Sequence, residues 1–150
     1  MPDKLTPEKR SWNMSRIKGK DTAIELKVRK YLFSRGYRFR KNDRRLPGTP
    51  DIVLPKYRTA VFINGCFWHR HIGCAKTTTP KSNLDFWERK FDRTIANDRR
   101  NYAELEKQGW NVIVLWECEL KKEKFATTMQ RVVNELDEIW IEGLAESRKP

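Results

Sequence analysis

Residues 65–74 hold most of the side chains that are able to do chemistry. This segment, GCFWHRHIGC, contains both histidines of the chain, two of its three cysteines and the adjacent aromatic residues Phe67 and Trp68. Thiolates and imidazoles bind transition metals, and a neutral imidazole is also a general base. The segment therefore combines metal ligands, a candidate base and an apolar surface.

Three thiols and one imidazole form a donor set that suits tetrahedral zinc. Cys66, Cys74 and Cys118 would supply the sulfur atoms, and either His71 or His69 would supply the nitrogen. Cysteines are also often buried simply as small apolar residues. We expect a structural Zn²⁺ site, which leaves one histidine for another role.

A carboxylate is expected close to that remaining histidine. Asp51 stands at the start of a predicted strand, and the next predicted strand ends at Ile63 and Asn64. Neighbouring strand ends would bring Asp51, the Ile63 carbonyl and His69 together. Mg²⁺ prefers oxygen ligands, and an imidazole takes a proton from an attacking water. The pattern predicts phosphodiester hydrolysis, although an isolated aspartate here is also common as a turn residue.

Two further carboxylates have both a structural and a functional interpretation. Glu25 follows Thr22 by three residues, the spacing of a helix capping box, but it could also face Asp51 and hold metal-bound water. Asp98 interrupts the apolar face of a predicted helix. It would lie at a solvated edge or orient an imidazole such as that of His69.

Alternating helices and strands must position these residues. The predicted helices span residues 6–20, 21–36, 83–107 and 124–142, and the predicted strands span residues 37–40, 51–54, 59–63 and 110–116. The second and third strands suggest an antiparallel pair, and the continuous apolar run 110–116 indicates a buried central strand. The order predicts one α/β domain over residues 1–150, with a mixed sheet flanked by helices.

The charge of the chain indicates a polyanionic partner. Its 150 residues include 32 Lys and Arg against 20 Asp and Glu, a net charge of +12. Nucleic acid is the simplest such partner, with a ribosomal or solubilising role as the alternative. No stretch approaches the ~20 apolar residues of a membrane span. The polar start and the odd number of cysteines favour a cytoplasmic protein without a membrane partner.

Six segments resemble the very-short-patch-repair (Vsr) mismatch endonucleases. They are Asn13–Met14 and residues 21–25, 46–51, 65–69, 98–100 and 116–118. The string GCFWH of residues 65–69 is highly specific, and the segments occur in family order over nearly the whole chain. The resemblance implies a restriction-endonuclease-like fold, with Mg²⁺-dependent nicking beside the thymine of a T:G mismatch left by deamination of 5-methylcytosine. It also implies a monomeric, nucleoid-associated bacterial protein that works with other mismatch-repair proteins.

The same resemblance implies roles for individual residues. Asp51 and the Ile63 carbonyl match ligands of Mg²⁺, His69 matches the base, and Glu25 matches a contact to metal-bound water. The matched zinc ligands are Cys66, His71, Cys74 and Cys118. The positions implied to contact or wedge into DNA are Phe67, Trp68, Trp87 and Lys90, together with Met14 and Ile17 on a basic helix within residues 1–20. Trp87 also fits simple packing along its helix.

Asn64 departs from the family, which has a second active-site histidine at this position. Asparagine still donates a hydrogen bond to a phosphate oxygen, but it cannot exchange a proton near neutral pH. We therefore expect slower turnover or an altered substrate preference. Two rival functions remain: a restriction-like nuclease acting on matched DNA, and a zinc-stabilised DNA-binding module that has lost catalysis.

Overall fold

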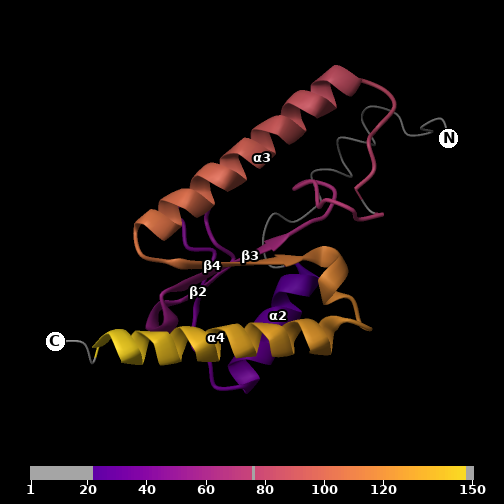
Figure 1. Cartoon of the computed structure of the whole chain (residues 1–150). Coiled ribbons are helices and arrows are strands. Elements are labelled where there is room, and N and C mark those ends of the chain that lie inside the picture. Colours follow the sequence, from indigo (N-terminus) through magenta and orange to yellow (C-terminus); the bar gives the residue numbers. More distant parts are fainter. Residues whose placement is uncertain (1–21, 76, 148–150) are drawn as a thin grey trace.

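A four-stranded mixed sheet forms the middle layer of the protein, with helices on both faces (Figure 1). This computed structural model describes residues 22–75 and 77–147. The strands, in sheet order, are β1 Arg40–Lys41, β2 Ile52–Leu54, β3 Thr59–Asn64 and β4 Asn111–Trp116. The first three are antiparallel neighbours, whereas β4 runs parallel to β3. The predicted α/β class with a mixed sheet is confirmed, while the predicted helix 6–20 lies outside the described residues.

Three long helices cover the two faces of the sheet. Helices α2 Ala23–Ser34 and α4 Phe125–Ser147 lie on one face, and α3 Leu84–Lys107 lies on the other (Figure 1). The larger core is formed by side chains of α2, α4 and the sheet, and the smaller core lies between the sheet and α3. None of the helices among the described residues is long and apolar enough to cross a membrane.

Local sequence signals explain where α2 begins and ends. The Thr22 side chain accepts a hydrogen bond from the amide of Glu25 at 3.2 Å, which caps the first turn. The helix stops before Gly36, whose φ of +92° is readily adopted only by glycine. The long helix predicted for residues 83–107 is confirmed as α3, and the last helix extends five residues beyond its predicted end at residue 142.

The strand predicted to be central is instead an edge strand of the described sheet. β4 pairs with β3 only, and its side chains alternate between the two cores. Ile113 and Leu115 pack with the α2 and α4 side, whereas Val112 packs with the α3 side. Because helices cover both faces of β4, a continuously apolar sequence suits this strand, although no strand pairs with its outer edge among the described residues.

The strand predicted for residues 37–40 is wrong for residues 37–39. Only Arg40–Lys41 pairs with β2. Tyr37 is buried in the larger core, where its ring lies 5.5 Å from that of Tyr57. Packing of the Tyr37 ring in the core therefore accounts for the aromatic residue that the sequence pattern interprets as the start of a strand.

The loop between β1 and β2 ends at Asp51, directly before the first residue of β2. Its tight turn needs Gly48, because φ is +78° and a Cβ atom would approach the Phe62 ring to 3.0 Å. Asp43 is buried at the base of the loop, where its carboxylate accepts hydrogen bonds from the Arg45 side chain at 2.9 and 3.0 Å and pairs with Arg40 at 3.2 Å. These hydrogen bonds, those from Arg45 first, lower the pKa of Asp43 to about 2.

Replacing Asp43 by asparagine is expected to destabilise the protein in a pH-dependent manner. The lowered pKa means that the carboxylate stabilises the fold above the ordinary aspartate pKa and loses this contribution as the pH falls toward about 2. Melting temperatures of wild type and Asp43→Asn should therefore differ at neutral pH and converge in acid. Equal melting temperatures at neutral pH would show that the ion pairs do not stabilise the loop.

Candidate active site and metal-binding cluster

Asp51 is fixed at the carboxyl end of β3 by a backbone hydrogen bond. The amide of Ile63 donates to Asp51 Oδ2 at 2.6 Å, as the antiparallel pairing of β2 with β3 brings the two residues together. Burial and, to a smaller degree, the negative charge of Glu25 raise the pKa of Asp51 to about 6. The Ile63 amide and the charges of Arg29 and His69 oppose this rise. The Ile63 contact is through its amide, so the role predicted for its carbonyl stays a prediction.

Glu25 approaches this site from α2. It is only 4% exposed, and its carboxylate accepts a hydrogen bond from Arg29 Nη2 at 3.2 Å. The capping interaction with Thr22 uses the backbone amide of Glu25, so its side chain is directed to Arg29. Glu25 and Asp51 are close enough for their charges to repel. Two neighbouring carboxylates, one buried and one partly buried, attract a cation.

His69 is held by Asp98 of α3. The distance from His69 Nδ1 to Asp98 Oδ2 is 2.7 Å, and both side chains are partly exposed. Of the two interpretations of Asp98, the structure therefore supports the one in which it orients an imidazole. A neutral imidazole that donates from Nδ1 has its lone pair on Nε2, where it accepts a proton.

Asn64 and Tyr102 meet beside the His69–Asp98 pair. Asn64 Nδ2 donates to the Tyr102 hydroxyl at 2.8 Å. Asn64, His69, Asp98 and Tyr102 line one open pocket of about 290 Å³, whose wall also includes Trp116. The sequence assigned Tyr102 only to the apolar face of α3. Its spacing of four residues from Asp98 is the signal that places both on one side of that helix.

The four predicted zinc ligands come together in a second cluster, formed by three residues of the loop 65–74 and by Cys118 after β4. The candidate ligand atoms of Cys66, His71, Cys74 and Cys118 all lie within 4.8 Å of one another. His71 Nδ1 is 3.6 Å from Cys66 Sγ and 3.4 Å from Cys118 Sγ. Cys66, Cys74 and Cys118 form no disulfide among the described residues, and together with His71 they could hold a metal ion.

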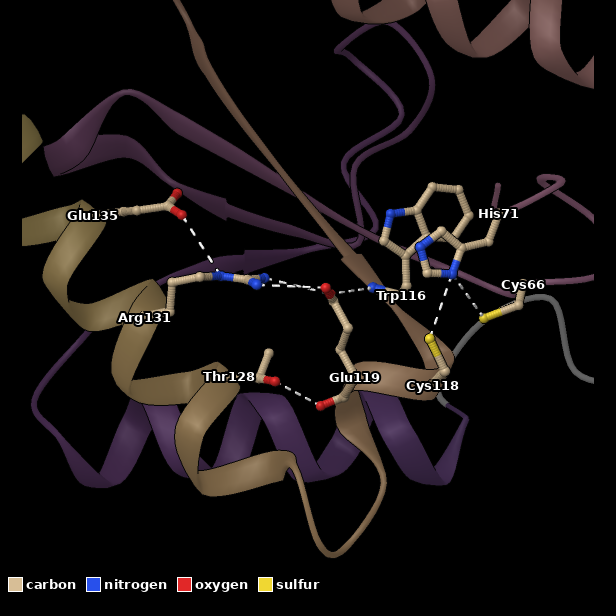
Figure 2. A network of polar contacts seen from close by, with 8 residues as sticks. All are labelled: Cys66, His71, Trp116, Cys118, Glu119, Thr128, Arg131 and Glu135. Atoms are coloured by element: carbon tan, nitrogen blue, oxygen red, sulfur yellow. Dashed lines mark hydrogen bonds and ion pairs between the residues drawn. The ribbon is translucent and has the colours of Figure 1, made fainter. Parts of the chain in front are cut away.

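A polar network supports this cluster from α4 (Figure 2). The His71 ring stacks on Trp116 at 4.2 Å, and the Trp116 amide donates to Glu119 Oε2 at 3.2 Å. Arg131 contacts the same carboxylate at 3.3 Å, so α4 anchors the short helix η2 Glu117–Leu120 that carries Cys118. Trp116 as the stacking partner of His71 was not predicted from the sequence.

The residues predicted to contact DNA form an aromatic cluster at the surface. Phe67 lies 5.0 Å from Trp68, 6.0 Å from Trp87 and 5.3 Å from Phe91, measured between ring centroids. Lys90 Nζ lies 4.9 Å from the centre of the Trp68 ring. The structure thus brings the predicted residues of the loop and of α3 together. Met14 and Ile17 lie outside the described residues.

Comparison with known proteins identifies the class to which this site belongs. Residues 2–76 match the family model described as DNA mismatch endonuclease Vsr. The chain is 50% identical over 137 residues to the type II nicking enzyme V.NmeAIP of Neisseria meningitidis, which covers 91% of this chain and 97% of the relative. It is 40% identical over 142 residues to the DNA mismatch endonuclease Vsr of Escherichia coli K12, covering 94% and 86%.

These matches confirm the resemblance seen in the sequence. A third relative, the type II nicking enzyme V.XorIIP of Xanthomonas oryzae, is 48% identical over 120 residues, or 80% of this chain and 88% of the relative. The chain belongs to the Vsr family of DNA-cleaving endonucleases.

Replacing Glu119 by glutamine is expected to weaken metal retention by the Cys/His cluster. The substitution removes the charge that pairs with Arg131 and so loosens the helix that carries Cys118. Loss of a partner that supports a ligand typically weakens metal binding about tenfold or more. Release of the ion to a chromogenic chelator should therefore be faster in Glu119→Gln.

Glu135→Gln is the matched control for this experiment. Glu135 also pairs with Arg131, at 3.8 Å, but among the described residues its side chain forms no hydrogen bond or ion pair with η2. Metal release from this variant should resemble that of wild type. Equal release from Glu119→Gln and wild type would contradict the supporting role of the network.

Proposed function

We propose that the protein is a Mg²⁺-dependent endonuclease that nicks one strand of duplex DNA beside the thymine of a T:G mismatch. The observation that carries this proposal is the His69–Asp98 pair next to the partly buried carboxylate of Asp51. Family membership supports DNA cleavage, and the Escherichia coli relative is named a mismatch endonuclease. The nick would begin very short patch repair of deaminated 5-methylcytosine.

Asp51 and the Ile63 carbonyl would hold Mg²⁺ in this proposal, and Glu25 would contact water bound to the ion. The ion supplies Lewis-acid stabilisation of negative charge on the phosphate. The repulsion between Asp51 and Glu25 supports a cation here, because the positive charge offsets it. His69 accepts the proton of the attacking water at Nε2, and Asp98 stabilises the resulting imidazolium through Nδ1.

Zn²⁺ is the ion that we assign to the Cys/His cluster. A tetrahedral zinc with ordinary bond lengths separates a nitrogen ligand from a sulfur ligand by roughly 3.6 Å. The two nitrogen–sulfur distances of 3.6 and 3.4 Å at His71 fit this geometry. Four protein ligands leave no open position, so the proposed role is structural.

The aromatic cluster supports recognition of a mismatch. Inserting apolar side chains into a base step costs a few kcal/mol of lost stacking, and each base stacked on an aromatic ring recovers ~1–3 kcal/mol. Phe67, Trp68 and Trp87 would therefore offset one opened step with little excess. A wobble pair opens more easily than a matched pair, so the balance favours lesions.

The remaining contacts and surroundings follow the family resemblance. Lys90 lies beside Trp68 and would meet the phosphate backbone. Met14 and Ile17, on the predicted helix within residues 1–20, would enter the opposite groove. We propose a monomeric cytoplasmic enzyme that acts with other mismatch-repair proteins.

Asp51→Asn is expected to abolish nicking without loss of mismatch binding. Removing a carboxylate that holds the catalytic ion should lower the Mg²⁺-dependent nicking rate on a T:G duplex at least about a hundredfold. The raised pKa of Asp51 means that its charge destabilises the fold near neutral pH when Mg²⁺ is absent. Without Mg²⁺, the melting temperature of Asp51→Asn should therefore be at least as high as that of wild type.

Asp137→Asn on α4 provides the control, since Asp137 is exposed and α4 contributes no residue to the site around Asp51. All mismatches and the matched T:A duplex should be compared in the same sequence context. Nicking of matched and T:G duplexes at equal rates would favour the restriction-like alternative. Binding without nicking of any duplex would favour the DNA-binding module and overturn the proposal.

A further inference from the structure

The contact between Asn64 and Tyr102 joins the end of β3 to the middle of α3. Asn64 is 4% exposed, and its amide donates to the Tyr102 hydroxyl at 2.8 Å. The Tyr102 ring packs against Phe62 with a centroid distance of 4.9 Å, so its position is fixed independently of the hydroxyl. The ring therefore holds the hydroxyl in one place, as a preorganised group requires.

Tyr102 and the candidate base line the same pocket. Tyr102 lies one helical turn beyond Asp98, and Asp98 holds His69 at 2.7 Å. Asn64, His69, Asp98 and Tyr102 all contribute to the wall of the 290 Å³ pocket. A group bound in this pocket would therefore lie beside both His69 and Tyr102.

The hydrogen-bond pattern leaves the Tyr102 proton available. The hydroxyl oxygen accepts from Asn64, so its own proton must point to a different partner. No protein acceptor takes this proton among residues 22–75 and 77–147. Burial, with smaller contributions from the charges of Asp98 and Asp51, raises the pKa of Tyr102 to about 12, while the Asn64 hydrogen bond opposes this rise. The hydroxyl is therefore a neutral donor at any pH at which the enzyme would work.

We propose that Tyr102 is a catalytic residue whose hydroxyl, oriented by Asn64, donates a hydrogen bond to a non-bridging oxygen of the scissile phosphate. This inference rests on the proposed nuclease function. Tyr102 keeps its proton throughout, while His69 takes the proton of the attacking water. The Asn64–Tyr102 pair thus supplies an uncharged donor where negative charge develops on the phosphate. It also explains how asparagine serves at position 64: it orients a donor and exchanges no proton.

Tyr102→Phe tests this proposal because it removes the hydroxyl and keeps the ring. Loss of one hydrogen bond to a charged oxygen should lower the single-turnover nicking rate about 10- to 100-fold on a T:G duplex, with duplex affinity unchanged. Tyr57→Phe is the control, since Tyr57 packs on Trp140 away from the pocket. The pH dependence of the rate should be the same in wild type and Tyr102→Phe, because Tyr102 does not titrate in the working range.

Phosphorothioate substrates identify the proposed contact directly. Sulfur is a poorer hydrogen-bond acceptor than oxygen, so replacing the contacted non-bridging oxygen should slow wild type more than it slows Tyr102→Phe. Sulfur effects of equal size in the two proteins would overturn the proposal, as would a wild-type rate in Tyr102→Phe. A parallel loss of binding and melting temperature would mean that Tyr102 only supports the fold. Absence of nicking by wild type on every duplex would instead refute the proposed function.

Discussion

The parallel pairing of β3 with β4 is the constraint on which both sites depend. Asn64 lies opposite Trp116 in this register, so both strands end at the same edge of the sheet. The chain after β3 therefore runs beside the chain after β4, which brings Cys66 close to Cys118 although 52 positions separate them. The Cys/His cluster at this edge joins the loop to the end of β4, and the same loop carries His69 to Asp98 on α3.

Unfavourable electrostatics distinguishes the other half of the candidate active site. Asp51 is partly buried beside Glu25, and Arg29 and the Ile63 amide compensate its charge only in part. A fold selected for stability alone would pair or replace such a carboxylate, because burial of like charges is unfavourable. By contrast, Asp43 at the other end of the same loop is paired with arginines, and its pKa falls. The loop thus has one carboxylate that stabilises it and one that a cation can use.

Sequence patterns predicted helices α2, α3 and α4 and the antiparallel pair of β2 with β3. Short-range signals sufficed for α2 and α3: the Thr22 cap, the Gly36 stop and the apolar spacing along α3. The grouping of the three cysteines with a histidine followed from their chemistry, and the family resemblance pointed to His71 as that histidine. The position of β4 at the sheet edge could not be predicted, because burial of its two faces by helices gives the same apolar run as a central strand. The Asn64–Tyr102 hydrogen bond could not be predicted from the sequence either. Its partners are 38 residues apart, and a tyrosine on the apolar face of a helix resembles ordinary core packing.

We propose above all that a metal ion in the Cys/His cluster fixes the loop that presents His69. Metal analysis of protein purified without added metal, followed by NMR spectroscopy of the same sample before and after chelation, tests this claim. We expect about one equivalent of zinc. Its removal should abolish the hydrogen-bonded ring-proton signal of His69 and broaden the signals of residues 65–74, while the amides of β3 stay unchanged. Protein without zinc that retains the His69–Asp98 hydrogen bond would contradict the account.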